Sequence, residues 1–133
     1  MPATLLLVEN TSVPRDPRVW AECKTLTNAG WDVSVICPRS DADGGSYEVL
    51  DGTRIYRFEP LEARSGARGY LAEYALSLHR IRRIVQTLGR GSRAFDIVHA
   101  ANPPDVLLTA ALPLRRRGAA TILDHHDLSP ELY

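Results

Sequence analysis

The chain has 133 residues, of which 44% are hydrophobic and 24% are charged, with nine Gly and nine Pro. This composition is typical of one soluble globular domain and excludes the disordered, collagenous and disulfide-dense classes. Sixteen Lys and Arg balance sixteen Asp and Glu, which argues against a dedicated nucleic-acid binder because such proteins carry a basic excess.

Apolar runs alternate with helical periodicity from the start of the chain. The run Thr4–Val8 is almost continuously apolar, which is typical of a strand at the centre of a parallel sheet. A helix is predicted next, because Asp16 can cap its amino terminus, Pro17 suits its first position and Gly30 follows its expected end. A second strand is predicted over Asp32–Cys37.

The same alternation continues along the rest of the chain. Residues 38–47 are rich in Gly, Asp and Ser and predict a surface loop, after which a short hairpin or a kinked third strand ends at Phe58. A long helix is predicted from about Tyr70 to Leu88, since its apolar residues recur at steps of three and four. Three further elements are expected: a strand over 95–100, a helix over 103–117 and a strand over 119–124.

Strands and helices in this order predict the α/β class, with a Rossmann-like, doubly wound and mainly parallel sheet of five strands in the spatial order 3-2-1-4-5. The strand order reverses between the first and the fourth strand. Ligands of such sheets bind beyond the carboxyl ends of the strands near this point. We therefore expect a functional site among the loops 9–15, 99–105 and 124–127.

Several nucleotide chemistries are excluded by missing residues. The single lysine, Lys24, lies inside the first helical pattern, whereas a phosphate-loop nucleotidase needs Gly-Lys-Ser/Thr after its first strand. The loop over 9–16 contains no glycine, so it lacks the Gly-x-Gly-x-x-Gly pattern of a dinucleotide site. Cys23 and Cys37 have no metal-ligand spacing and are predicted to be buried apolar thiols.

Asp124, His125, His126 and Asp127 form the densest titratable cluster of the chain. Consecutive residues cannot converge on one ion without other ligands, and His99 is the one obvious helper, so we expect no metal site. A histidine held by a carboxylate near an acceptor hydroxyl fits the cluster better, because imidazole titrates near neutrality. The alternative is that each histidine is a hydrogen-bonded structural residue.

Arg15 and Arg18 flank the start of the first predicted helix, where free backbone amides already favour anions. A phosphate group on an acceptor could dock there. The alternative is that both arginines are solvated beside the helix cap.

Four segments together resemble a known family: Arg15–Val19, Gly30–Cys37, Asp96–His99 and Leu123–Tyr133, the last with the pattern Asp-His-His-Asp-Leu-x-Pro-Glu-Leu-Tyr. They resemble the amino-terminal domain of family 4 glycosyltransferases, over essentially the whole chain. The resemblance implies the GT-B architecture, in which the first Rossmann-like domain binds the acceptor and the second binds most of the nucleotide-sugar donor. It also implies a hexosyl transfer with retention and without an obligatory metal.

Site roles are assigned on this basis. We expect Asp127 and His126 to be catalytic. Acceptor-binding roles are expected for Asn10, Arg15, His99, Asn102 and His125. Many family members have a second histidine two residues after the position of His99, but this chain has Ala101 there, so that histidine cannot be carried over.

Residues 1–133 are expected to form an amino-terminal, acceptor-binding domain that is truncated before its donor domain. The fragment alone is expected to bind no cofactor and to be inactive, whereas the full-length enzyme would use a nucleotide sugar. The expected partners are a sugar or lipid-linked acceptor and the missing carboxy-terminal donor domain. The alternatives are a stand-alone Rossmann-like module for a small anionic ligand or a partner protein and, as a weaker rival, a metal-dependent hydrolase.

A cytoplasmic location is expected, because residues 1–4 carry no positive charge typical of a signal sequence and no apolar run approaches roughly 18 residues. Residues 63–93 hold seven Arg and one Glu. A basic amphipathic helix can rest on anionic lipid headgroups, so peripheral contact with the inner membrane is a further expectation. The alternative is a solvated face in a chain with fifteen Arg and one Lys.

Overall fold

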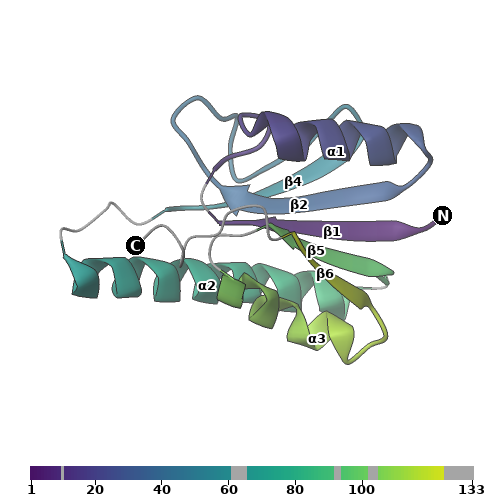
Figure 1. The fold of residues 1–133 in the computed structure, drawn as a ribbon. Coiled ribbons are helices and arrows are strands. Elements are labelled where there is room, and N and C mark those ends of the chain that lie inside the picture. Colours follow the sequence, from purple (N-terminus) through teal and green to yellow (C-terminus); the bar gives the residue numbers. More distant parts are fainter. Residues whose placement is uncertain (10, 61–65, 92–93, 102–104, 125–133) are drawn as a thin grey trace.

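The computed structural model describes residues 1–9, 11–60, 66–91, 94–101 and 105–124. Its centre is a six-stranded sheet in the order β3-β4-β2-β1-β5-β6. The strands are β1 (Ala3–Val8), β2 (Asp32–Pro38), β3 (Tyr47–Leu50), β4 (Thr53–Phe58), β5 (Ile97–Ala101) and β6 (Ala120–Asp124). The helices are α1 (Pro17–Asn28), α2 (Ala67–Arg90), the 3-10 helix η1 (Asp105–Ala111) and α3 (Leu112–Arg115). Figure 1 shows α1 on one face of the sheet and α2 with α3 on the other.

The order of the parallel strands confirms the predicted fold class. β1 lies between β2 and β5, β4 pairs with β2, and β6 pairs with β5, all in parallel. β3 is antiparallel to β4 and adds a sixth strand at the edge of the sheet. The hairpin alternative is therefore the observed one, and its turn residues Asp51 and Gly52 both have positive φ, as a tight two-residue hairpin turn requires.

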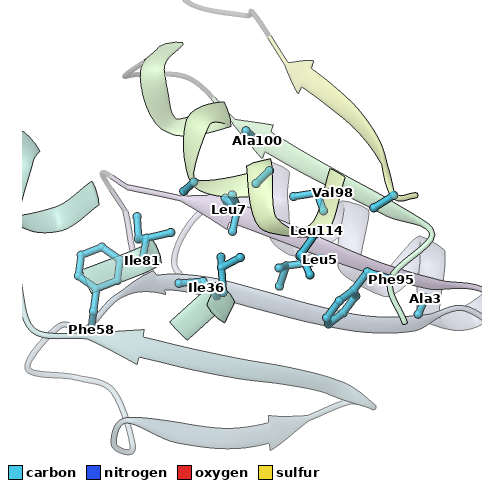
Figure 2. Packing of buried hydrophobic residues seen from close by; sticks show 14 residues of the cluster. Ala3, Leu5, Leu7, Ile36, Phe58, Ile81, Phe95, Val98, Ala100 and Leu114 are labelled. Atoms are coloured by element: carbon cyan, nitrogen blue, oxygen red, sulfur yellow. The ribbon is translucent and has the colours of Figure 1, made fainter. Parts of the chain in front are cut away.

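The core has two layers because side chains alternate along each buried strand. Along β1, Leu5 and Leu7 face α2, whereas Leu6 and Val8 face α1. Figure 2 shows the first layer, in which residues of β1, β2, β4 and β5 meet Ile81 of α2 and Leu114 of α3. The second layer packs the sheet against α1, with Val19 and Cys23 buried as predicted.

Helix α1 begins and ends as the sequence predicts. The Asp16 carboxylate accepts hydrogen bonds from the backbone N–H groups of Arg18 and Val19 at 3.1 and 3.2 Å, and so caps the helix. Gly30, with φ of +90°, follows the last turn and allows the chain to reverse into β2.

The prediction of a single helix over 103–117 is wrong, because most of its described residues form a 3-10 helix and not an α-helix. The described part is a 3-10 helix of seven residues followed by a short α-helix of four residues. Pro113 explains the break, because it has no N–H group to donate to the carbonyl of Thr109 and is tolerated only in the first turn of a new helix.

Candidate functional site

The carboxyl ends of the five parallel strands lie at one edge of the sheet, and this edge is the candidate site. Of the residues assigned from the sequence, the structure describes Arg15 and His99. Arg15 is exposed in the turn before α1. The remaining assignments lie outside the described residues and stay predictions: Asn10, Asn102, His125, His126 and Asp127.

His99 lies on the α1 face of β5, beside Leu6 of β1. Its Nδ1 atom is 2.5 Å from Oε1 of Glu22 in α1, and its Nε2 atom is 4.0 Å from Oδ2 of Asp124 in β6. The Nε2 atom is buried and finds no hydrogen-bond partner in the described part of the chain. His99 therefore lies between two carboxylates that come from a helix and a neighbouring strand.

The hydrogen bond to Glu22 raises the pKa of His99, burial opposes this rise, and the charges of Glu22 and Asp124 add to it. The charged imidazolium can donate from both ring nitrogens, toward one carboxylate on each side. The arrangement thus favours a protonated His99 that holds α1 against β5 and β6.

We expect Glu22→Gln to lower the free energy of unfolding by about 1 kcal/mol near pH 5.5 and by less near pH 9. The folded state binds the His99 proton more tightly than the unfolded chain does. This stabilisation is therefore fully present below the unfolded pKa of about 6.5 and is lost as the pH rises through the higher folded pKa.

Urea unfolding at the two pH values measures the effect, and Glu59→Gln is the matched control because the Glu59 carboxylate pairs with Arg39, whose charge does not change over this pH range. An equal loss of stability at both pH values for Glu22→Gln would contradict the charged state of His99.

Glu9 follows the last residue of β1, at the point where the strand order reverses, and is 8% exposed. Burial raises the pKa of Glu9, a hydrogen bond from Ser77 of α2 lowers it, and the charge of Glu73 raises it. A buried carboxyl group with a raised pKa at a strand end is typical of sites that move protons. Glu9 is therefore an additional candidate residue of this edge.

Arg57, near the end of β4, joins the loops of this edge. Its side chain is fully buried, and Nη2 donates to the carbonyl oxygen of Val13 at 2.8 Å and to Oε1 of Glu48 at 2.5 Å. Nη1 donates to the carbonyl oxygen of Gly45 at 3.2 Å, and Nε is 3.6 Å from Oδ2 of Asp43. One guanidinium group thus ties the loop before α1 to the loop between β2 and β3 and to β3 itself.

The neighbouring loop contacts extend this network. The backbone N–H of Ser40 donates to the Asp43 carboxylate at 2.6 Å, and the hydroxyl of Ser12 lies 3.4 Å from that of Ser40. The loop that carries Arg15 is therefore held in place by buried and partly buried polar contacts.

The sequence analysis included Glu9 in the expected loop 9–15 but assigned it no role, and it missed Glu22 and Arg57. The position of Arg57 could have been noticed in the sequence, because Thr53, Ile55 and Arg57 alternate onto one face of a strand. A charged side chain on a buried face needs a buried partner. For Glu22 no local signal exists, because its partner His99 lies on a distant strand.

The described residues include two free thiols and no group of side chains arranged to hold a metal ion. No three His, Cys, Asp or Glu side chains in the described ranges lie close enough to hold a metal ion. Cys23 and Cys37 are free and buried, as predicted, and burial raises the pKa of Cys23 to about 12 and that of Cys37 to about 11. Neither thiol is therefore a nucleophile at neutral pH.

The topology defines a Rossmann-like domain, and its carboxyl edge at the switch point is the candidate ligand site. More particularly, the chain belongs to the glycosyl transferase 4-like domain family, whose sequence profile matches residues 16–133. No curated protein sequence matches the chain.

Solved structures with a similar fold include two that illustrate its range. Sucrose-phosphate synthase from Thermosynechococcus elongatus superposes with a TM-score of 0.71 and 13% identity, over 100% of this chain and 35% of that chain. The C-terminal domain of a hydrogenase from Pyrococcus furiosus superposes with a TM-score of 0.65 and 14% identity, over 92% of this chain and 91% of that one. At these identities the likeness shows the fold alone, and this chain spans about a third of the length of the synthase.

None of the helices in the described ranges has the length and apolar character needed to cross a membrane.

Proposed function

We propose that this chain is the acceptor-binding domain of a glycosyltransferase. The whole enzyme transfers a hexosyl group, with retention, from a nucleotide sugar to an acceptor in cell-envelope glycan or glycolipid synthesis. The observation that carries the proposal is the family match over residues 16–133, together with the strand order of the sheet. In this proposal residues 1–133 bind the acceptor, and a carboxy-terminal donor domain holds the nucleotide sugar, which the fragment alone does not bind.

In the proposed reaction the acceptor hydroxyl oxygen forms a bond to the anomeric carbon while the bond from that carbon to the diphosphate breaks. In this proposal Asp127 acts nearest the reacting hydroxyl, because in sequence it comes three residues after Asp124, the last residue of β6. A carboxylate there accepts or orients the hydroxyl proton, which can also pass to the departing diphosphate. His126 orients the acceptor or stabilises developing charge, and no step needs a metal.

Acceptor binding is proposed for the loops at the same edge. Arg15 is exposed beside the free amides at the start of α1, which suits a phosphate or carboxylate on the acceptor. Asn10, Asn102 and His125 follow β1, β5 and β6 in sequence and supply hydrogen bonds to sugar hydroxyls. His99, flanked by Glu22 and Asp124, is also proposed to contact the acceptor.

The proposed location is the cytoplasm, with peripheral contact at the inner membrane. Support comes from α2, which carries five Arg and one Glu over Ala67–Arg90. Four of these arginines are exposed: Arg68, Arg82, Arg83 and Arg90. Cationic side chains on a helix are attracted to anionic headgroups, which would bring the enzyme to a lipid-linked acceptor.

The rival function is a stand-alone module that binds a small anionic ligand or a partner protein. This rival is retained because a hydrogenase domain of similar length has the same fold. The complete coding sequence separates the two. About 200 further residues with a second Rossmann pattern, as a two-domain enzyme requires, are expected. A natural stop near Tyr133 would contradict the glycosyltransferase and support the module.

A further inference from the structure

A groove runs between α2 and β4 on the face of the sheet opposite α1. Its floor is Tyr56 and Phe58, its wall is Ile84 and Leu88, and Arg80 and Arg83 stand on its rim. The hollow has a volume of about 550 Å³, and an adjoining hollow of about 370 Å³ shares Tyr56 and Leu88 with it. We name these two hollows together the α2–β4 groove. Figure 1 shows the long helix α2 lying across this face of the sheet.

The larger hollow is mainly apolar, whereas the lining of the adjoining hollow also includes Arg54 and Thr87. The adjoining hollow extends it along the hairpin, where the ring of Tyr47 packs at a tilt of 45° against Tyr56, with centroids 5.0 Å apart, and Tyr47 is 51% exposed. The sheet therefore presents aromatic and aliphatic side chains in a continuous trough of the size that small ligands occupy.

One end of the groove is cationic. Phe58 ends β4 at the carboxyl edge, and Arg80 and Arg83 stand at this end. Arg80 is held there because its guanidinium donates to the carbonyl oxygen of Glu59. The carboxylate of Glu59, which also lines the hollow, is paired with Arg39 at 2.6 Å, so Arg39 balances its charge and the charges of Arg80 and Arg83 are left for a ligand. This end attracts an anion.

We propose that the α2–β4 groove binds a single-chain amphipathic anion, an aliphatic phosphate. Its tail lies along Tyr56, Phe58 and Leu88, and its phosphate lies between Arg80 and Arg83. Charge complementarity and the apolar trough together select this chemistry, since neither an uncharged lipid nor free phosphate uses both parts. The site lies on the α2 face of the sheet, its lining contains none of the residues assigned to the acceptor, and binding there does not depend on sugar transfer.

Calorimetric titration of the full chain with dodecyl phosphate, below its critical micelle concentration, tests the site. We expect saturable one-to-one binding, at least about tenfold tighter than for dodecyl maltoside or inorganic phosphate. Equal affinity for dodecyl maltoside would overturn the proposal, and so would binding only to vesicles of phosphatidylglycerol and phosphatidylcholine, because a bilayer surface needs no groove.

Matched variants locate the binding. Arg80→Gln combined with Arg83→Gln should weaken it about tenfold, whereas Arg82→Gln, on an exposed position of α2 that does not line the groove, should leave it unchanged.

Thr87→Trp should block the trough at the junction of its two hollows, and Gln86→Trp is its control. Equal weakening by Arg82→Gln, or full affinity in Thr87→Trp, would overturn the site. Amide shifts of residues 80–88 in a dodecyl phosphate titration give a second readout that does not rely on the variants.

Discussion

Arg57→Met is expected to lower the free energy of unfolding by about 3–5 kcal/mol, because breaking a buried ion pair leaves its partners uncompensated. The substitution removes the donors of the Val13 and Gly45 carbonyls and leaves the carboxylates of Glu48 and Asp43 without their guanidinium. Urea unfolding followed by circular dichroism measures the loss.

Two variants serve as controls for Arg57. Arg57→Lys keeps the charge but loses the planar fork, so its stability should lie between those of the wild type and Arg57→Met. Arg39→Met removes an exposed pair with Glu59 and should change stability little. If Arg57→Met were as stable as Arg39→Met, the network around Arg57 would not hold the loops of the carboxyl edge.

Asp127→Asn in the full-length protein is expected to lower turnover by about 100-fold to 10,000-fold, the range of general-base contributions, or by much less if the donor phosphate takes the proton. Its fold should survive, so the melting temperature is measured beside kcat and KM. Asp41→Asn, in the exposed loop after β2, is the matched control.

A small effect of Asp127→Asn on turnover would argue against a catalytic role for Asp127. If turnover and acceptor affinity both stayed within about twofold of the wild type, roughly 0.4 kcal/mol, Asp127 would leave the proposed site. Asp127 or Ser129 would then be read as the cap of a helix that begins near Pro130, because both residue types cap helices and proline suits the first turn.

The fold follows from the sequence because each parallel strand is an apolar run and each crossover helix has its own boundary residues. Thr4–Val8 and Asp32–Cys37 are buried strands in the predicted order, and Asp16 and Gly30 bound the helix between them. The hairpin stayed one of two alternatives, because Asp51–Gly52 predicts a turn but four residues of β3 are too few for a clear periodicity.

For the candidate site, the sequence predicts only where it lies in the fold, not which side chains contact one another there. The rule that ligands bind beyond the carboxyl ends of strands selects the loops, and the structure adds contacts that join distant segments. Arg57 and Val13 are 44 residues apart, and no local pattern pairs them. The same holds for Glu22 and His99, whose contact requires α1 to lie over β5.

The fold alone does not distinguish between the possible functions of this chain. A hydrogenase domain and sucrose-phosphate synthase are both similar to this chain, at 14% and 13% identity. The family match over residues 16–133 separates these readings, because it depends on particular residues rather than on the sheet.

Sugar transfer by the full-length protein and by residues 1–133 alone tests the proposed division of labour between two domains most directly. Both are incubated with a panel of nucleotide sugars and a lipid extract that contains acceptors, and the released nucleoside diphosphate and the glycosylated product are quantified. We predict that the full-length protein releases diphosphate and forms product with one donor, and that residues 1–133 remain folded but form none. Transfer by residues 1–133 alone, from any nucleotide sugar, would contradict the assignment of this chain as the acceptor-binding domain.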